Sequence, residues 1–220
     1  MHFDVVTFDC YGTLIDWEDG ISAAFARAWG VDQARHREAV LRAYAAVEPQ
    51  VQAAGFRVYK EVLAETARRV ADHLAWDAGP RDWAFLAESL PAWPPFPDTA
   101  DALRSLHHAG LRLGILSNVD DDLLAGTLRQ LPPVFDFLVT AEQIRSYKPA
   151  PGHFLACRDV IGSATWLHVA QSWFHDVTPA TRLGVPVCWI NRKGEERGVG
   201  GAPIAEFPTL EGVVDSIVKT

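Results

Sequence analysis

The feature that most constrains the fold is a short apolar run near the start of the chain. Val5-Val6-Thr7-Phe8 ends in Asp9, and a turn containing Gly12 follows. Such a run is typical of a strand buried on both faces of a parallel sheet. Open α/β sheets place their chemistry at the carboxyl ends of their strands, and Gly12 lets the chain approach a ligand closely. Asp9 is therefore a candidate nucleophile, although an isolated aspartate here could merely cap the turn.

The composition bounds the class of protein. With 220 residues and 49% hydrophobic content, the chain can bury a core without a metal or disulfide. A net charge of −8 argues against a nucleic acid or a membrane surface as partner. Cys10, Cys157 and Cys188 are few and scattered, which favours reduced core thiols. With no apparent targeting segment or membrane-spanning run, we expect a cytoplasmic protein.

A block of helical periodicity follows Asp16. Its apolar residues recur at spacings of three and four, with breaks at Gly30, at Pro49 with Gly55, and at Gly79-Pro80. A run of helices without a strand cannot belong to the alternating pattern of the sheet, so residues 17–92 are predicted to form a helical cap domain. Residues 1–16 and 93–220 would then form the core domain. The expected helices are Asp19 to Trp29, Gln33 to Val47, Phe56 to Trp76 and Arg81 to Leu90.

The rest of the chain alternates between strands and helices. A proline-rich segment, residues 91–97, predicts a stiff return to the core, and Asp98 is expected to cap the next helix. At least five strands with helical crossovers predict an α/β fold with a doubly wound parallel sheet ordered around the first strand. The loop between Asn191 and Ala202 lacks the context of a phosphate-binding loop and is interpreted as solvated. The later strands are expected at 111–116, 134–139, 165–171 and 186–190.

Several polar residues should converge on Asp9. Ser117 and Asn118 close the second strand of the core, and Lys148 stands in Tyr147-Lys148-Pro149 just before a helix. Lysine beside a buried aspartate keeps the aspartate ionised and stabilises developing charge. Taken singly, each of these residues is more often a turn residue or a surface charge.

The whole set of motifs resembles the haloacid dehalogenase superfamily. Asp9-Cys10-Tyr11-Gly12-Thr13-Leu14 is similar to its first motif, and Ser117, Lys148 and Asp176 stand at the positions of the other three. The resemblance implies a Rossmann-like core with an inserted cap.

Magnesium-dependent phosphatases of this superfamily carry further acids in the first and fourth motifs. Here Tyr11 and Gln171 stand at those positions, so the oxygen ligands that magnesium needs are depleted. The resemblance is closest to the type II 2-haloacid dehalogenases, and it implies an enzyme without a metal or other cofactor.

In that branch, an aspartate displaces halide from Cα of a short 2-haloalkanoic acid and forms an ester, which water hydrolyses to a 2-hydroxy acid. Asp9 would be the nucleophile, with Lys148 and Asp176 as the other catalytic residues. The halide would meet Asn118 and a cap arginine; Arg42 matches best, ahead of Arg27 and Arg57. Groups expected to bind the substrate otherwise come from Cys10, Tyr11, Thr13, Ser117 and Ser172.

Two departures from the branch leave the reacting bond open. Phe154 stands where the dehalogenases have a tyrosine, and the fourth motif reads Ala170-Gln171-Ser172. The alternatives are a phosphatase with an altered magnesium site and a non-catalytic homologue that binds small carboxylates. His175 and Asp176 are adjacent but are not expected to act as a unit. The resemblance also suggests a homodimer.

Overall fold

The computed structural model describes residues 2–218, and its centre is a six-stranded sheet in which every neighbouring pair is parallel. The strand order is β3-β2-β1-β4-β5-β6. The predicted doubly wound sheet is confirmed, with a sixth strand that the sequence did not indicate. The strands are β1 (Val5–Phe8), β2 (Arg112–Ser117), β3 (Phe137–Thr140), β4 (Trp166–Ala170), β5 (Val187–Ile190) and β6 (Ala205–Phe207).

β1 lies in the middle of the sheet, between β2 and β4. The chain winds outward through β2 and β3, then crosses back to β4 on the other side of β1. Ligands of open α/β sheets bind at this switch point, outside the carboxyl ends of the strands. The residue that follows β1 there is Asp9.

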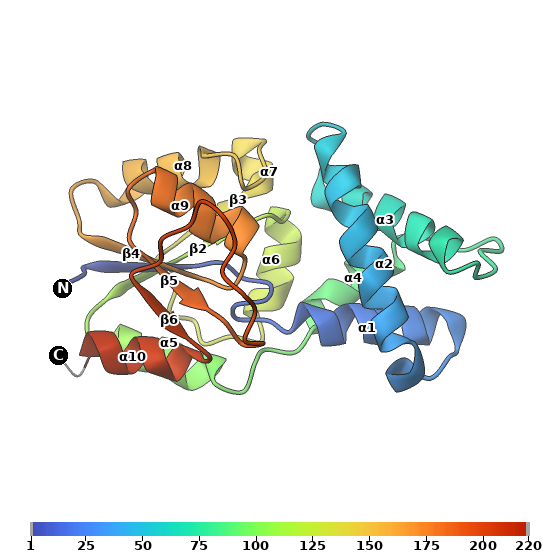
Figure 1. Cartoon of the computed structure of the whole chain (residues 1–220), viewed down its shortest axis with the longest axis horizontal. Coiled ribbons are helices and arrows are strands. Elements are labelled where there is room, and N and C mark those ends of the chain that lie inside the picture. Colours follow the sequence, from blue (N-terminus) through green and yellow to red (C-terminus); the bar gives the residue numbers. More distant parts are fainter. Residues whose placement is uncertain (1, 219–220) are drawn as a thin grey trace.

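Helices cover both faces of the sheet (Figure 1). On one face lie α5 (Thr99–His108) and α10 (Leu210–Val218), and on the other lie α8 (Gly152–Ile161) and the short α9 (Thr178–Arg182). Side chains alternate between the faces, so Val6 and Phe8 join the core beneath α5 and α10, whereas Val5 joins the core beneath α8 and α9. The remaining core helices are α6 (Asp121–Leu128), α7 (Ala141–Ile144) and a π-helical turn, η2 (Trp173–Val177).

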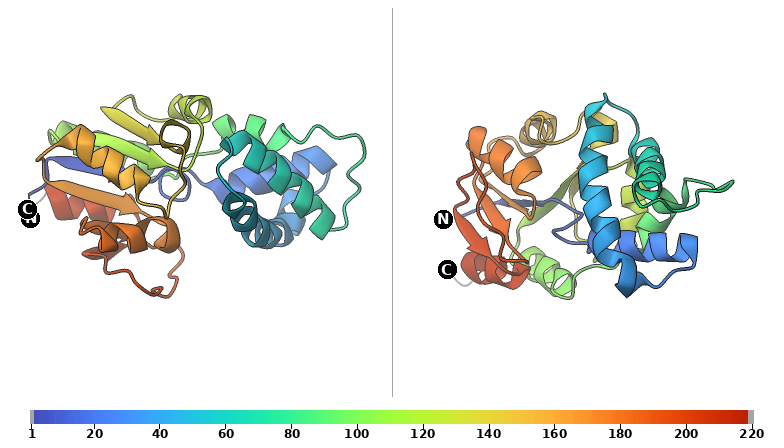
Figure 2. Two further views of the ribbon diagram at one scale, coloured as in Figure 1. Left: turned by 90° about the horizontal axis from the view of Figure 1, so that it is seen from above. Right: turned by 45° about the vertical axis from the view of Figure 1, so that its right-hand side comes forward.

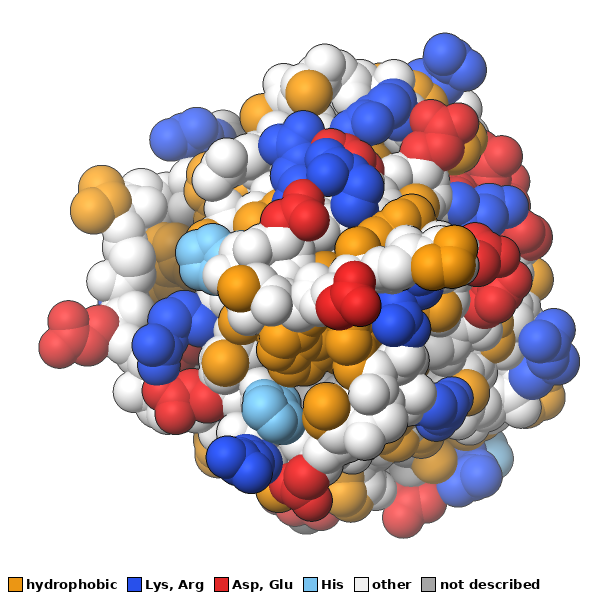
Figure 3. Space-filling model, turned by 90° about the vertical axis from the view of Figure 1, so that its right-hand side faces the viewer, with side chains coloured by type: hydrophobic (Ala, Val, Ile, Leu, Met, Phe, Trp, Pro, Cys, Tyr) orange, Lys and Arg blue, Asp and Glu red, His pale blue; other side chains and the backbone are white. Residues whose placement is uncertain are grey.

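A separate group of helices, called the cap helices here, lies beside the carboxyl edge of the sheet (Figures 1 and 2). No strand interrupts them. On the outer face of this group, acidic and basic side chains are interspersed among the described residues and form no continuous basic patch (Figure 3). The cap helices are α1 (Trp17–Trp29), α2 (Gln33–Ala53), α3 (Tyr59–His73) and α4 (Phe85–Ser89), followed by the 3-10 turn η1 (Leu90–Ala92).

The predicted break at Pro49 is wrong, because α2 continues through it to Ala53. Proline removes one helical hydrogen bond, but its fixed φ is compatible with a helix. Tyr44 and Val51, on either side of Pro49, are both buried, so packing holds the helix together across the gap.

Two chain segments connect the cap helices to the core, and they pair with each other. Ile15 forms an antiparallel bridge with Pro95, and the Asp16 N–H donates to the Pro94 carbonyl at 2.8 Å. The Phe96 N–H donates to the Leu14 carbonyl at 3.0 Å. The proline-rich return is therefore extended from Pro94 to Phe96, where it is fixed against the segment that leaves β1, but the prediction is wrong for Pro91 and Ala92, which lie in η1.

Asp98 occupies the N-cap position of α5, as predicted, but its side chain makes no capping hydrogen bond there. Its carboxylate instead accepts hydrogen bonds from the Arg192 guanidinium at 3.1 Å and from the Leu210 N–H at 2.7 Å. Arg192 also donates to the Thr13 carbonyl at 2.9 Å. The loop that begins at Asn191 is thus not merely solvated, since its arginine holds the turn after β1.

Within residues 2–218, no helix is both long and apolar enough to cross a membrane.

Candidate active site

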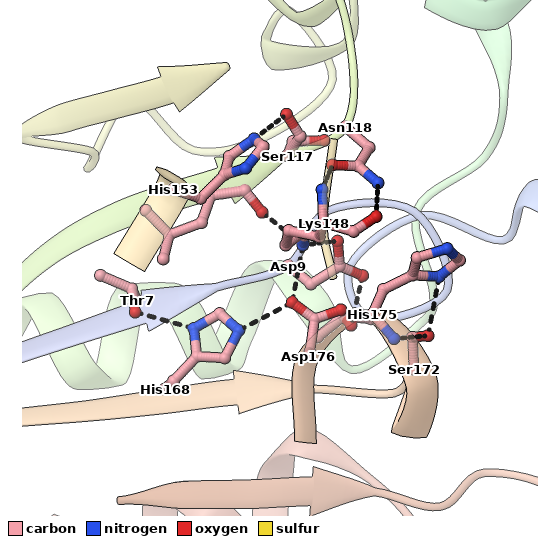
Figure 4. Close-up of polar contacts among 12 residues, drawn as sticks. Thr7, Asp9, Ser117, Asn118, Lys148, His153, His168, Ser172, His175 and Asp176 are labelled. Carbon is pink, nitrogen blue, oxygen red and sulfur yellow. Dashed lines mark hydrogen bonds and ion pairs between the residues drawn. The ribbon is translucent and has the colours of Figure 1, made fainter. Parts of the chain in front are cut away.

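The carboxyl ends of the central strands bring four predicted residues together (Figure 4). Asp9 follows β1, Ser117 ends β2, Lys148 lies between α7 and α8, and Asp176 lies in η2 after β4. Parallel strands end at one edge of a sheet, so residues far apart in the sequence meet here.

Each carboxylate oxygen of Asp9 is held by one side chain. The Lys148 ammonium donates to Oδ1 at 2.9 Å, and the Thr13 hydroxyl donates to Oδ2 at 3.1 Å. Thr13 in turn accepts from the Gln171 N–H at 2.9 Å. Asp9 is only 7% exposed and faces a cavity, so the carboxylate is oriented and largely shielded from water.

Lys148 is fully buried and uses all three ammonium hydrogens. Besides Asp9, it donates to Asp176 Oδ1 at 2.6 Å and to the Leu116 carbonyl at 2.8 Å. Burial by itself would lower the pKa of Lys148, but the two carboxylates outweigh it and raise that pKa. Lys148 therefore remains a cation.

The two aspartates differ in their environment. Burial raises the pKa of Asp9, and the attraction of Lys148 opposes this change only in part. Burial also acts on Asp176, but Lys148 and His168 outweigh it and hold the pKa of Asp176 well below its usual range. Asp176 thus stays ionised, and its Oδ2 is buried without a hydrogen-bond partner.

A buried chain of hydrogen bonds supports Asp176 from behind (Figure 4). His168 Nε2 lies 3.0 Å from Asp176 Oδ1, and His168 Nδ1 lies 2.9 Å from the Thr7 hydroxyl. The Trp166 indole donates to that hydroxyl at 2.6 Å, and because the ionised Asp176 carboxylate can only accept, His168 Nε2 is the donor to it. Sequence reasoning missed this chain; its signal was a threonine and a histidine inside two apolar strands.

The residues after Asp9 offer backbone donors. The Cys10 side chain is buried in the core, and the Tyr11 hydroxyl bonds Thr127 at 2.9 Å, so neither the thiol nor the hydroxyl is free to bond a ligand. Their backbone N–H groups form no hydrogen bond with the described chain. The Ser117 hydroxyl is buried and also lacks a partner, and Ser117 lines the cavity.

Two other predicted residues line the cavity but use their polar atoms internally. Asn118 accepts from the Lys148 N–H at 2.7 Å and donates to the Lys148 carbonyl at 3.0 Å, so it positions the lysine. Ser172 accepts from the His175 N–H, and its hydroxyl lies 3.1 Å from His175 Nδ1. Burial lowers the pKa of His175.

The structure does not bring Arg42 to the site. Its side chain is 75% exposed and pairs with Glu38 on the same helix. Arg42 lies two residues from both Val40 and Tyr44, so it points away from the buried face of the helix to which they belong. Arg27 is exposed, and Arg57 donates to the Val51 carbonyl. None of the three lines the cavity.

The cavity between the core and the cap helices has a volume of about 290 Å³. Glu48 of α2 takes part in its wall, where sequence reasoning expected an arginine. Burial raises the pKa of Glu48 to about 7, against the effect of hydrogen bonds from Gln52 and Tyr59. The missed signal was the position of Glu48, four residues after Tyr44 and three before Val51, on the apolar stripe of α2.

Phe154 is fully buried and packs against Trp166 and His168, away from the cavity lining.

The site residues do not fit a magnesium ion. Tyr11 and Gln171 supply no carboxylate, and both aspartates already bind the ammonium of Lys148. Among residues 2–218, no three His, Cys, Asp or Glu side chains gather as metal ligands.

A family model for haloacid dehalogenase-like hydrolases matches residues 3–169. The chain belongs to this family. It is 28% identical over 225 residues to an (S)-2-haloacid dehalogenase of Pseudomonas sp. (strain YL), covering 96% of this chain and 92% of the relative. It is also 26% identical to haloacetate dehalogenase H-2 of Moraxella sp. (strain B), covering 97% of each chain.

A solved structure shares the fold of this chain. A crystal structure of an L-2-haloacid dehalogenase superposes with a TM-score of 0.88 at 23% identity, covering 99% of this chain and 100% of the other. As a member of this hydrolase family, the chain has the α/β Rossmann-like core that the motifs implied.

Proposed function

We propose that this hydrolase displaces a leaving group, halide in the simplest case, from C2 of a short carboxylic acid through an ester on Asp9. The observation that carries the proposal is the Asp9 carboxylate, held by Lys148 and Thr13 at the edge of the cavity between the core and the cap helices. The relatives that act on 2-haloacids and haloacetate support the substrate class.

In the first step, an oxygen of Asp9 attacks C2 and the bond to the halogen breaks, with the electron pair leaving on the halide. The substrate carboxylate would accept hydrogen bonds from the free N–H groups of Cys10 and Tyr11 and from the Ser117 hydroxyl. The carbon attacked carries no charge, so this step needs no divalent cation to relieve repulsion.

In the second step, water attacks the carbonyl carbon of the Asp9 ester. The free Oδ2 of Asp176 is the available acceptor for a proton of this water, and Lys148 stabilises the negative charge that develops on the ester carbonyl. The ester then collapses, the 2-hydroxy acid leaves, and the carboxylate of Asp9 is restored. The net reaction consumes one water and releases one halide and one proton.

The test is halide release from chloro-, bromo- and fluoroacetate and from both 2-chloropropionate enantiomers, with and without EDTA. We expect release that EDTA does not change and that Asp9→Asn abolishes. Absence of release from every acid would overturn the proposal, as would loss of release with EDTA.

A single turnover in ¹⁸O-labelled water distinguishes the ester route from direct attack by water. With enzyme in excess, the product should carry unlabelled oxygen from Asp9, and the label should appear in the enzyme. Label in the first product would exclude the aspartyl ester.

Three broader features are also proposals. We propose that residues 17–92 are a cap domain on a core of residues 1–16 and 93–220, which limited proteolysis near Asp16 and Trp93 can test. Three buried free cysteines support a reducing, cytoplasmic location. The homodimer suggested by the motifs can be checked by light scattering.

A further inference from the structure

More acidic than basic side chains line the cavity. Glu48 is 8% exposed and lines the cavity together with Asp9 and Asp176. Among the described residues that line it, Lys148 is the only lysine or arginine, and the two aspartates and the Leu116 carbonyl already occupy its ammonium. A negative group at the cap side would therefore meet no free cation.

Aromatic rings also line the cavity. The Tyr11 and Trp93 rings meet edge-on at 5.8 Å, the Trp17 and Tyr44 rings lie 5.8 Å apart, and the Tyr44 and Tyr59 hydroxyls are 3.3 Å apart. The faces of aromatic rings attract cations, and groups of rings bind organic ammonium ions in many proteins. The cavity-lining rings are those of Tyr11, Trp17, Tyr44, Tyr59 and Trp93.

Pro49 adds a further acceptor beside Glu48. Because proline has no N–H, the Ala45 carbonyl cannot accept the helical hydrogen bond that residue 49 would otherwise donate. Ala45, Glu48 and Pro49 all line the cavity. This wall thus combines a carboxyl group with a carbonyl that lacks its usual partner, and both attract a hydrogen-bond donor.

Within the part of the chain that the structure describes, no lysine, arginine or histidine forms an ion pair with Glu48. Glu48 acts electrostatically on the hydroxyls of Tyr44, Tyr59 and Tyr147, but burial raises the pKa values of these hydroxyls, so they are neutral and supply no charge. Burial of Glu48 raises the pKa of its carboxyl to about 7. A bound cation would supply the missing charge and lower that pKa again.

We propose that the cap side of the cavity binds an ammonium group, so that the substrate is a short carboxylic acid with a cationic amine beyond the carbon that Asp9 attacks. The placement of the substrate's carboxylate beside Cys10, Tyr11 and Ser117 rests on the proposed function. Binding of the ammonium by Glu48 and the surrounding rings does not depend on turnover.

The test uses two unreactive ligands of equal shape, 4-aminobutyrate and pentanoate, which differ by an ammonium in place of a methyl group. Calorimetry on the wild-type protein should show at least about tenfold tighter binding of 4-aminobutyrate. Glu48→Gln should remove this preference, whereas Glu38→Gln, an exposed glutamate on the same helix, should retain it.

A second readout needs no variant. At about pH 6, Glu48 is largely protonated in the empty cavity, so binding of the ammonium, which lowers the pKa of Glu48, should release protons. Calorimetry in two buffers with different ionisation enthalpies measures this release, which pentanoate should not produce. Equal affinity for the two ligands, no proton release with 4-aminobutyrate, or a preference that survives in Glu48→Gln would each overturn the proposal. Failure of the halide assay would leave this binding test unaffected.

Discussion

His168 Nε2 donates to Asp176 Oδ1 at 3.0 Å, and both side chains are almost completely buried. Because Thr7 and His168 are register partners on β1 and β4, the imidazole is held from the sheet itself. Asp176 precedes a short helix and is fixed by this contact and by Lys148. The sheet therefore orients the carboxylate that we assign to the hydrolytic step.

Thr7→Val tests this arrangement. The variant preserves shape but leaves Trp166 Nε1 without an acceptor and His168 Nδ1 without its hydrogen-bond partner. We expect a loss of about 1–3 kcal/mol in the free energy of unfolding. We also expect kcat to fall about tenfold with little change in KM, because Thr7 does not line the cavity.

Thr7→Ser restores the hydroxyl and should recover both quantities. A burst of halide release followed by slow turnover in Thr7→Val would place the defect in ester hydrolysis. An unchanged kcat in a folded Thr7→Val protein would show that the hydrogen-bond chain does not position Asp176.

Lys148→Met removes the cation between two buried carboxylates. We expect the free energy of unfolding to fall by about 3–5 kcal/mol, because the carboxylates are left unpaired. The pKa of Asp9 should rise further, so any remaining turnover should shift to higher pH.

Chemical denaturation and a pH–rate profile measure both effects. Lys60→Met is the matched control, since Lys60 pairs with Asp122 at the surface and should contribute within about 1 kcal/mol. Equal losses in the two variants would mean that the buried ion pair does not stabilise the fold.

The sequence predicted the parts of the site that follow strands. Asp9, Ser117 and Lys148 stand at strand or loop ends, where residue type and spacing are informative. It could not predict which face of a cap helix meets the cavity, because that depends on how α1, α2 and α3 pack. Arg42 and Glu48 are six residues apart on α2, and only the packing shows that the glutamate, not the arginine, lines the cavity together with Asp9.

The burial of His153 predicts how the free energy of unfolding depends on pH. Its Nε2 donates to the Ser117 carbonyl at 3.0 Å, Nδ1 is buried without a partner, and burial lowers the pKa of His153 to about 3. Its pKa in the unfolded chain is about 6.5. Between these values the unfolded state binds one more proton, so stability is lost as the pH falls, by at most about 1.4 kcal/mol per pH unit.

His153→Gln keeps a donor for Ser117 and removes the titration. Urea denaturation from about pH 6.5 to 4 should give a flatter stability curve for the variant than for the wild type. At pH 7.5 His153 is neutral in both states, so comparison there isolates the cost of the substitution itself. Parallel curves would contradict a neutral buried His153.

Pro49→Ala tests whether Pro49 strengthens ligand binding in the cavity while it lowers the stability of α2. Alanine supplies the missing N–H to the Ala45 carbonyl and removes a residue that costs about 3 kcal/mol inside a helix. We therefore expect the variant to be more stable, by about 1–3 kcal/mol in thermal or denaturant unfolding.

The same substitution should weaken binding of 4-aminobutyrate, because the Ala45 carbonyl then bonds within the helix and the proline ring leaves the cavity wall. Gln50→Ala, at an exposed neighbouring position on α2, should leave this affinity unchanged. A destabilised Pro49→Ala protein would mean that packing of the proline ring outweighs the restored hydrogen bond. Higher stability with unchanged affinity would mean that the free carbonyl takes no part in recognition of the ammonium, which would then depend on Glu48 and the aromatic rings alone.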